Sequence, residues 1–289
     1  MRQPKPGGVA AISRSVLSAT AGAAVRRVRR ELQWRDRRYD FEVAHGAAPF
    51  EHVIAEHATP LIRRLAGVDE RLQRNKAVNL RLAVARLDGV VVAPGQRLSF
   101  WREVGKPTHR RGFVEGLVLK QGRLSSGVGG GLCQLSNLLY WMTLHTPLTV
   151  VERWRHSYDV FPDAGRTQPF GSGATVAWPL LDLQIENRTA APYQLTLAVT
   201  GTHLVGVWTS PEPVLQRYRI EERNHRITHE GPGVYVRRNE LWRETVHPDG
   251  RVEAELVAVN DARMMYAPFL PEASQGSVAS PSSAPSSAA

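Results

Sequence analysis

The sequence predicts an α+β fold in which helices come first and an antiparallel, β-rich C-terminal half follows. Two observations carry this prediction. Apolar residues recur at helical spacing over residues 48–88, with Arg and Glu between them. From residue 148 onward, short β-branched and aromatic runs alternate with turn residues. Helices followed by a run of strands are typical of α+β proteins, whereas strictly alternating elements indicate a parallel sheet.

A glycine-rich loop that leads into a central helix joins these two parts. Gly89 ends the first helical region, and short strands are expected at 90–93, 98–100 and 117–119. Three consecutive glycines, 129–131, are separated from Cys133 by the single residue Leu132. After Cys133, apolar residues return at helical spacing in Leu135, Leu138, Leu139 and Met142. The pattern therefore predicts a helix with Cys133 at or near its N-terminus.

The C-terminal half is expected to consist mainly of strands. A hairpin turn is predicted at residues 247–250, where His-Pro-Asp-Gly separates two β-type runs. The candidate strands are 149–152, 157–161, 174–178, 181–186, 193–199, 203–208, 218–222, 234–236, 241–246 and 252–259.

Charge and composition divide the chain into three expected parts. Of the formal net charge of +10 over 289 residues, the first 40 residues carry ten Arg and Lys against three acidic residues, a net of +7. The composition, with 42% hydrophobic residues, excludes a wholly disordered chain. We expect a basic N-terminal arm at 1–40, one folded domain at 41–270, and a disordered Ser/Pro/Ala tail at 271–289.

The basic arm indicates where the protein resides. Arg14 interrupts the weakly apolar stretch 8–25, which argues against a secretory signal, and no run approaches the ~18 apolar residues of a spanning helix. We expect a cytoplasmic protein or one peripheral at the inner membrane face. A basic amphipathic helix running to about Trp34 would suit an anionic membrane surface. We do not expect nucleic acid as a partner, because the aromatic residues are not interleaved with basic ones.

Cys133 is the first candidate for chemistry. A thiol at a helix N-terminus feels the positive end of the helix dipole, which lowers its pKa and favours the nucleophilic thiolate. Backbone amides around residues 131–134 could bind a developing oxyanion. The alternative is a buried cysteine that behaves as a small hydrophobic residue.

His156 is the best candidate partner for this thiol. It follows Cys133 by 23 residues and lies after the helix, at the edge of a predicted strand. In thiol enzymes a histidine takes the thiol proton and a third polar group orients the imidazole. Candidates for that group are Asp159, Asp163, Asp182 and Asn187. Alternatively, Trp154 and Tyr158 simply pack against His156.

The same region supplies candidate binding residues for a peptide or glycan, and these are Gly129, Gly130, Gly131, Gln134, Ser136 and Arg153. No cofactor is expected, since no Gly-Lys-Ser/Thr follows the glycines. No metal is expected either, because His225 and His229 are four apart in a stretch that reads as strand or loop. The single cysteine excludes a disulfide framework.

Several of these segments, taken in order, resemble the VanW family. They are Asn79-Leu80, Pro94-Gly95 with Leu98-Ser99-Phe100, Gly112-Phe113, the Gly-Gly-Gly-Leu-Cys-Gln run of 129–134, Glu152-Arg153-Trp154-Arg155-His156, and Ala174-Thr175-Val176 with Asp182 and Asn187. The resemblance covers residues 75–200 best. It implies a link to the cell envelope and to vancomycin resistance, but it supplies no reaction.

The resemblance is imperfect at Gly173, where the family usually has Asp before Ala-Thr-Val. Two functions therefore stay open. One is a thiol hydrolase or acyl transferase acting on peptidoglycan-type amide bonds, with Cys133 as nucleophile and His156 as base. The other is a non-catalytic accessory module that binds a peptidoglycan peptide, glycan or precursor, which the loss of an acidic residue at position 173 favours.

Overall fold

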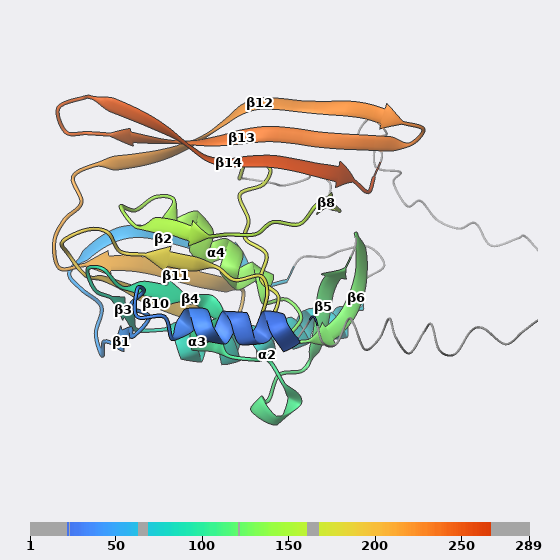
Figure 1. Cartoon of the computed structure of the whole chain (residues 1–289), viewed down its shortest axis with the longest axis horizontal. Helices are drawn as coiled ribbons and strands as arrows, with labels where there is room; N and C mark the ends of the chain where they lie inside the picture. The colour runs from blue at the N-terminus through green and yellow to red at the C-terminus, as the bar shows by residue number, and fades with distance from the viewer. Residues whose placement is uncertain (1–21, 23, 63–68, 121, 161–167, 267–289) are drawn as a thin grey trace, which may run out of the picture.

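The structure is a computed structural model that describes residues 22, 24–62, 69–120, 122–160 and 168–266. It confirms the α+β class. A five-stranded antiparallel sheet, in the order β1-β3-β10-β11-β2, forms the centre of the body (Figure 1). Its strands are β1 (Ala44–His45), β2 (His52–Pro60), β3 (Val90–Val92), β10 (Tyr193–Val199) and β11 (His203–Ser210).

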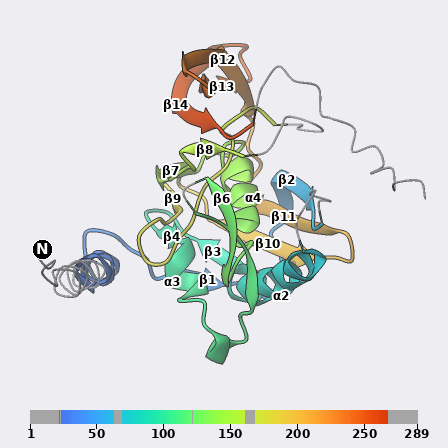
Figure 2. The same cartoon turned by 90° about the vertical axis from the view of Figure 1, so that its right-hand side faces the viewer.

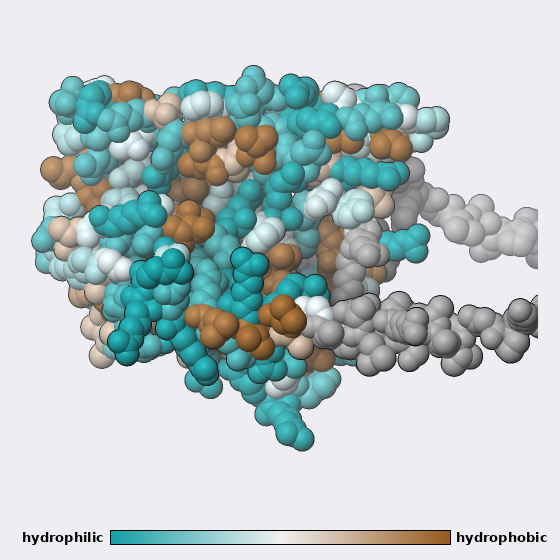
Figure 3. Space-filling model, in the orientation of Figure 1, coloured by the Kyte–Doolittle hydropathy of each residue, from teal (hydrophilic) through white to brown (hydrophobic). Residues whose placement is uncertain are grey.

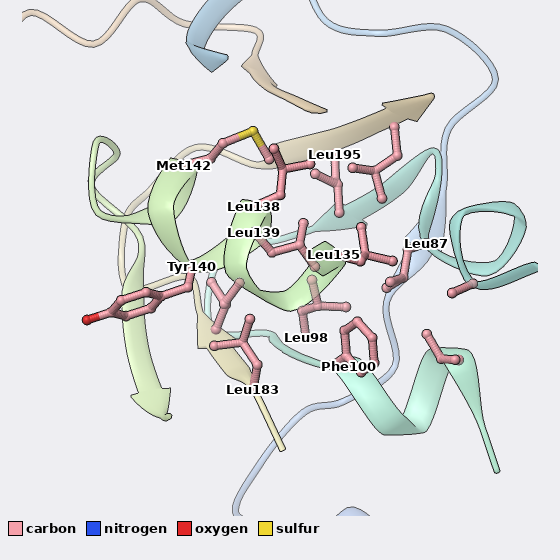
Figure 4. Packing of buried hydrophobic residues seen from close by; sticks show 14 of the residues in the cluster. Leu87, Leu98, Phe100, Leu135, Leu138, Leu139, Tyr140, Met142, Leu183 and Leu195 are labelled. Atoms are coloured by element: carbon pink, nitrogen blue, oxygen red, sulfur yellow. The ribbon is translucent and has the colours of Figure 1, made fainter. Parts of the chain in front are cut away.

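Two helices pack against this sheet. Helix α2 (Glu70–Leu87) contacts β10, and α4 (Cys133–Thr143) contacts β11 and β2. Their apolar side chains share one cluster with α3 (Phe100–Val104), in which Leu87, Phe100, Leu138 and Leu195 converge (Figure 4). Gly206 on β11 permits this approach, because a Cβ there would lie 2.6 Å from the terminal methyl carbon of Met142.

Smaller sheets complete the body. Strands β4 (Arg97–Ser99), β9 (Gln184–Glu186) and β7 (Thr149–Glu152) form an antiparallel sheet of three, and β5 (Glu115–Lys120) pairs with β6 (Arg123–Val128). A short 3-10 helix, η1 (His109–Arg111), precedes β5.

Three long antiparallel strands form a separate layer above the body (Figures 1 and 2). They are β12 (Arg217–Gly231), β13 (Val234–Val246) and β14 (Val252–Met264), and β8 (Tyr158–Asp159) pairs in parallel with β14. The predicted hairpin at 247–250 is confirmed between β13 and β14. The predicted strand pair 234–236 and 241–246 is one continuous strand.

The helical prediction is wrong for residues 48–62, and residues 63–68 lie outside the described part of the chain. Residues His52–Pro60 form strand β2, which pairs along its length with β11 at an edge of the five-stranded sheet. Its burial alternates between half-buried and exposed positions, as a period-two element requires, except at Ile54 and Ala55, where the pairing with β11 is irregular. The partner strand lies about 150 residues downstream, so nothing local in the sequence indicated it.

The separation of helices first and strands later is also too simple, because β1, β2 and β3 join the C-terminal strands β10 and β11 in one sheet. The strand predicted at 174–178 is absent from the described structure, in which only an isolated bridge links Ala177 to Leu181.

A helix at residues 24–34 lies against the body and is seen in blue at the front of Figure 1. Arg30 fixes it there, donating to both carboxylate oxygens of Glu152 at 2.6 and 2.7 Å and to the carbonyls of Pro179 and Leu180. The predicted extent of this helix, to about Trp34, is confirmed. The weakly apolar stretch 8–25 and the tail 271–289 lie largely or wholly outside the described residues.

Candidate functional site

The glycine-rich loop leads directly into α4, and Cys133 is the first residue of that helix, as predicted. The loop can turn this sharply because Gly129 and Gly131 adopt φ of 76° and 93°, values that disfavour any residue with a Cβ. The amide of Gln134 donates to the carbonyl of Gly131 at 3.1 Å. One of the amides expected to bind an oxyanion is therefore already occupied within the turn.

The thiol of Cys133 lies on the inner side of the helix. The residue as a whole is half-buried and packs against the hydrophobic cluster, and its Sγ donates to the Val176 carbonyl at 3.7 Å. Burial raises the pKa of the Cys133 thiol, and the carbonyl contact does not reverse this. The expectation of a lowered pKa is wrong, because burial disfavours the charged thiolate more than the backbone hydrogen bonds favour it.

His156 is not brought to the thiol by any contact of the described chain. It precedes β8, which belongs to the upper sheet, and Ser157 next to it accepts a hydrogen bond from the Arg263 amide. No described side chain hydrogen-bonds its ring, and burial lowers the pKa of His156. A general base for Cys133 would need a hydrogen bond to Sγ, and the hydrogen bond that Sγ forms among the described residues goes to the backbone carbonyl of Val176.

The glycines of the loop are packed rather than open. A Cβ at Gly130 would lie 2.2 Å from the carbonyl group of Gly116, and one at Gly131 would lie 2.2 Å from the Lys76 side chain. Buried Asn79 fastens the loop, since its Nδ2 donates to the carbonyls of Gly130 and Val114. These glycines serve close approach between chain segments, and a substrate backbone could not lie in the same space.

The polar side chains of α4 also have internal partners. Gln134 donates to Thr59 Oγ1 and to the Pro60 carbonyl, both at 2.9 Å, and Ser136 donates to the Ala174 carbonyl at 2.6 Å. Arg153 donates to the carbonyls of Gly171 and Gly173 and packs over the Tyr140 ring. All three of these candidate binding side chains connect elements of the fold.

Gly173 itself has a steric explanation. A Cβ at this position would lie 2.7 Å from Oδ1 of Asn137, which accepts a hydrogen bond from the Ala174 amide at 2.8 Å. The space that a larger residue would need is taken by the Asn137 side chain on α4.

The candidate third groups are spread over the fold. Asp182 is buried and accepts hydrogen bonds from Ser99 Oγ at 2.5 Å and from the Trp101 amide at 3.0 Å. Burial raises its pKa to about 6, against the opposing effect of these donors. Asp159 bonds Tyr266, Asn187 bonds the Val92 and Ala191 carbonyls, and Asp163 lies outside the described residues.

His225 and His229 lie on β12, where a spacing of four does not form a helical metal site. His225 accepts a hydrogen bond from Arg237, and His229 stacks on Tyr235.

A hollow lies elsewhere, between the helix at 24–34, the end of β7 and residues 179–181. It has a volume of about 800 Å³ and adjoins a second hollow of about 650 Å³, with which it shares Gln33, Tyr39, Glu152 and Trp154. We refer to the two together as the arginine groove. Its cationic lining consists of Arg26, Arg29, Arg30, Arg38, Arg97 and Arg188.

These arginines outnumber the carboxylates that face them. Arg30 is neutralised by Glu152, and Arg38 by Asp36. Arg97 and Arg188 share the single carboxylate of Glu186, and Arg97 stacks on the Tyr39 ring at 4.1 Å with its buried Nε unpaired. Arg26 and Arg29 have no acidic partner among the described residues, so the groove carries excess positive charge.

Sequence reasoning missed this groove. Glu152 and Trp154 belong to the segment that resembles the VanW family. In the sequence analysis this segment was connected only with Cys133, because it contains His156, the candidate base. The other wall of the groove is the helix at 24–34. Its arginines were visible in the sequence, but we considered them only as the net charge of the arm. Residues 174–182 connect the two regions, since Val176 holds the Cys133 thiol and Pro179–Leu181, a few residues on, line the groove.

Comparison with known proteins agrees with the motifs. A family model described as "VanW like protein" matches residues 75–209. The chain is 29% identical over 222 residues to the "Vancomycin B-type resistance protein VanW" of Enterococcus faecalis, covering 76% of this chain and 81% of that protein. It is also 29% identical over 146 residues to "Uncharacterized protein YoaR" of Bacillus subtilis, covering 50% of this chain and 46% of YoaR. No solved structure matches at a significant level. Residues 75–209 are therefore similar to the VanW family, and the similarity to the Enterococcus protein extends over 76% of the chain.

Proposed function

We propose that this chain is a VanW-like accessory protein of the cell envelope that binds an anionic peptidoglycan precursor in the arginine groove. The observation that carries the proposal is the position of that groove. It is bordered by Glu152 and Trp154 of the family segment and by Arg26 and Arg29, which lack acidic partners among the described residues. The envelope link is supported by the similarity to a protein named for vancomycin resistance.

The chemistry of the lining suits a ligand that is both anionic and partly apolar. Guanidinium groups bind carboxylates and phosphates through paired hydrogen bonds. Trp154 is 47% exposed at the edge of both hollows, where its ring can cover the face of a sugar or an apolar side chain. A muramyl peptide joined to a diphosphate combines these groups, and a volume of about 800 Å³ is of the size that small-molecule sites have.

The binding test uses the full chain and a muramyl pentapeptide linked to uridine diphosphate, with titration calorimetry as the readout. Arg29→Gln and Trp154→Ala are each expected to weaken binding at least about tenfold. Arg27→Gln is the matched control, because Arg27 lies on the same helix, pairs with Glu31 and does not line the groove. Equal affinities for Arg29→Gln and Arg27→Gln would contradict the groove assignment.

A thiol-dependent hydrolase or acyl transferase is the second candidate, favoured by one observation, the position of Cys133 as the first residue of α4. This function requires a covalent intermediate on Sγ of Cys133. To form it, the buried thiol would have to leave its present contact with the Val176 carbonyl. Cys133→Ser separates the two candidates. The accessory function predicts unchanged precursor binding and no loss of biological function, whereas the enzymatic function predicts complete loss of turnover with binding retained.

A further inference from the structure

The helix at residues 24–34 has a charged side chain facing the body and an apolar face exposed, the reverse of an ordinary surface helix. Its charged Arg30 is buried against the body, where it pairs with Glu152. Trp34, one turn further on, also faces inward and packs on Trp178 at 5.7 Å. A helix that merely covers a core would place its apolar stripe inward and its arginines in water. The inward polar anchor therefore leaves the apolar stripe on the other side.

That stripe is Val25, Val28 and Leu32, whose spacing of three and four places them on one face. They are 67%, 54% and 60% exposed, which makes them among the most exposed large apolar residues of the described chain. Figure 3 shows apolar side chains gathered over this helix, with hydrophilic surface above and below them. An apolar row this exposed indicates an interaction surface.

The charges beside the stripe indicate what covers it. Arg29 borders one edge of the stripe, and Arg26 lies beyond Arg29 on the side of the arginine groove. At the other edge Glu31 is paired with Arg27, so this pair adds no net charge. A second copy of this helix, packed stripe to stripe, would bring Arg26 and Arg29 of both copies together, and these residues have no acidic partner among the described residues to offset their repulsion. A surface that offers both hydrocarbon and negative charge would cover the apolar stripe and pair with the arginines beside it.

We propose that residues 24–34 dock this protein on an anionic lipid bilayer, with Val25, Val28 and Leu32 inserted at the headgroup boundary and the flanking arginines among the lipid phosphates. The helix would lie parallel to the membrane plane, since Arg30 and Trp34 hold its opposite face on the body. Apolar burial and attraction to acidic headgroups both contribute to such binding.

The test is co-sedimentation of the full chain with phosphatidylcholine vesicles, with and without phosphatidylglycerol, at low and physiological salt. We expect binding that needs phosphatidylglycerol and weakens with salt. The double variant Val25→Ser/Val28→Ser is expected to lose at least about tenfold in partitioning. The matched control is Val252→Ser/Val259→Ser on β14, two valines that are 53% and 62% exposed and far from the arm in sequence.

Three results would overturn the proposal. The first is vesicle binding by Val25→Ser/Val28→Ser that equals that of the wild type, and the second is equal binding to vesicles without acidic lipid. The third is a wild-type dimer that vesicles do not dissociate and that the double variant does not form. Circular dichroism and thermal unfolding check that both double variants are folded. Neither Val25 nor Val28 lines the arginine groove, so Val25→Ser/Val28→Ser should bind the precursor in solution as the wild type does. A wild-type protein that binds vesicles but not the precursor would contradict the proposed function and leave the membrane proposal intact.

Discussion

The Cys133 thiol donates to the carbonyl of Val176 at 3.7 Å, and this contact ties the start of α4 to the segment that leads to the arginine groove. Residue 133 therefore has a structural partner in the folded chain. It is the residue on which an enzymatic function would depend, and the contact holds its sulfur toward the interior.

The first prediction concerns the reactivity of this thiol. Because burial raises the pKa of Cys133, the folded protein should react with iodoacetamide at pH 7 at least about tenfold more slowly than free cysteine. Mass spectrometry of timed samples measures the rate, and the same protein in guanidinium chloride is the control for an accessible thiol. Alkylation faster than free cysteine at pH 6–7 would instead establish an activated thiolate.

The second prediction concerns Asn79, which fastens the glycine loop. Asn79→Ala removes two donated hydrogen bonds and the one its Oδ1 accepts from the Val114 amide, all at a buried position. We expect a loss of about 2–4 kcal/mol in the free energy of unfolding, measured by urea titration. Asn75→Ala, one turn earlier on α2, removes a single bond to the Glu115 carbonyl and should cost about 1 kcal/mol or less. Equal losses would mean that the loop is held by something else.

The third prediction concerns the anchor of the N-terminal helix. Arg30→Gln leaves Glu152 without its bidentate partner and removes bonds to two carbonyls, so we expect a loss of about 3 kcal/mol. Limited proteolysis should then cut within residues 24–40. Arg27→Gln removes only an exposed pair with Glu31 and should change stability by less than about 0.5 kcal/mol. An Arg30 variant as resistant to protease as the wild type would contradict the anchoring role.

The fourth prediction concerns the pH dependence of stability. Burial raises the pKa of Asp182 from 3.8 to about 6, so the folded protein binds a proton that the unfolded chain releases between these values. The contribution of Asp182 to stability is therefore most favourable below pH 4 and falls as the pH rises through 6, by up to about 3 kcal/mol. Urea titrations at several pH values measure this slope.

Asp182→Asn should remove that part of the slope between pH 4 and 6. Asp249→Asn, in the exposed turn between β13 and β14, is the control and should leave the slope unchanged. A slope that persists in Asp182→Asn would show that another group titrates in this range.

Local patterns were sufficient for elements whose signal lies within a few residues. The glycine-to-helix junction at Cys133 and the hairpin at 247–250 are examples, because glycine conformation and turn chemistry act locally. They were insufficient for β2, which is a strand because β11 pairs with it from 150 residues away. The charge of the arm was counted correctly, but charge alone does not tell a tethered helix from a free one.

Local periodicity and short motifs in the sequence were sufficient to predict the α+β class, the similarity to the VanW family and the position of Cys133 at a helix start. The surroundings of those residues depend on the tertiary structure instead. It turned the Cys133 thiol toward Val176, packed Lys76 and Gly116 against the glycine loop, and brought Arg26, Arg29 and Trp154 to one hollow. The physical reason is that burial and long-range contacts, which set a side chain's pKa and accessibility, arise from residues far apart in the chain.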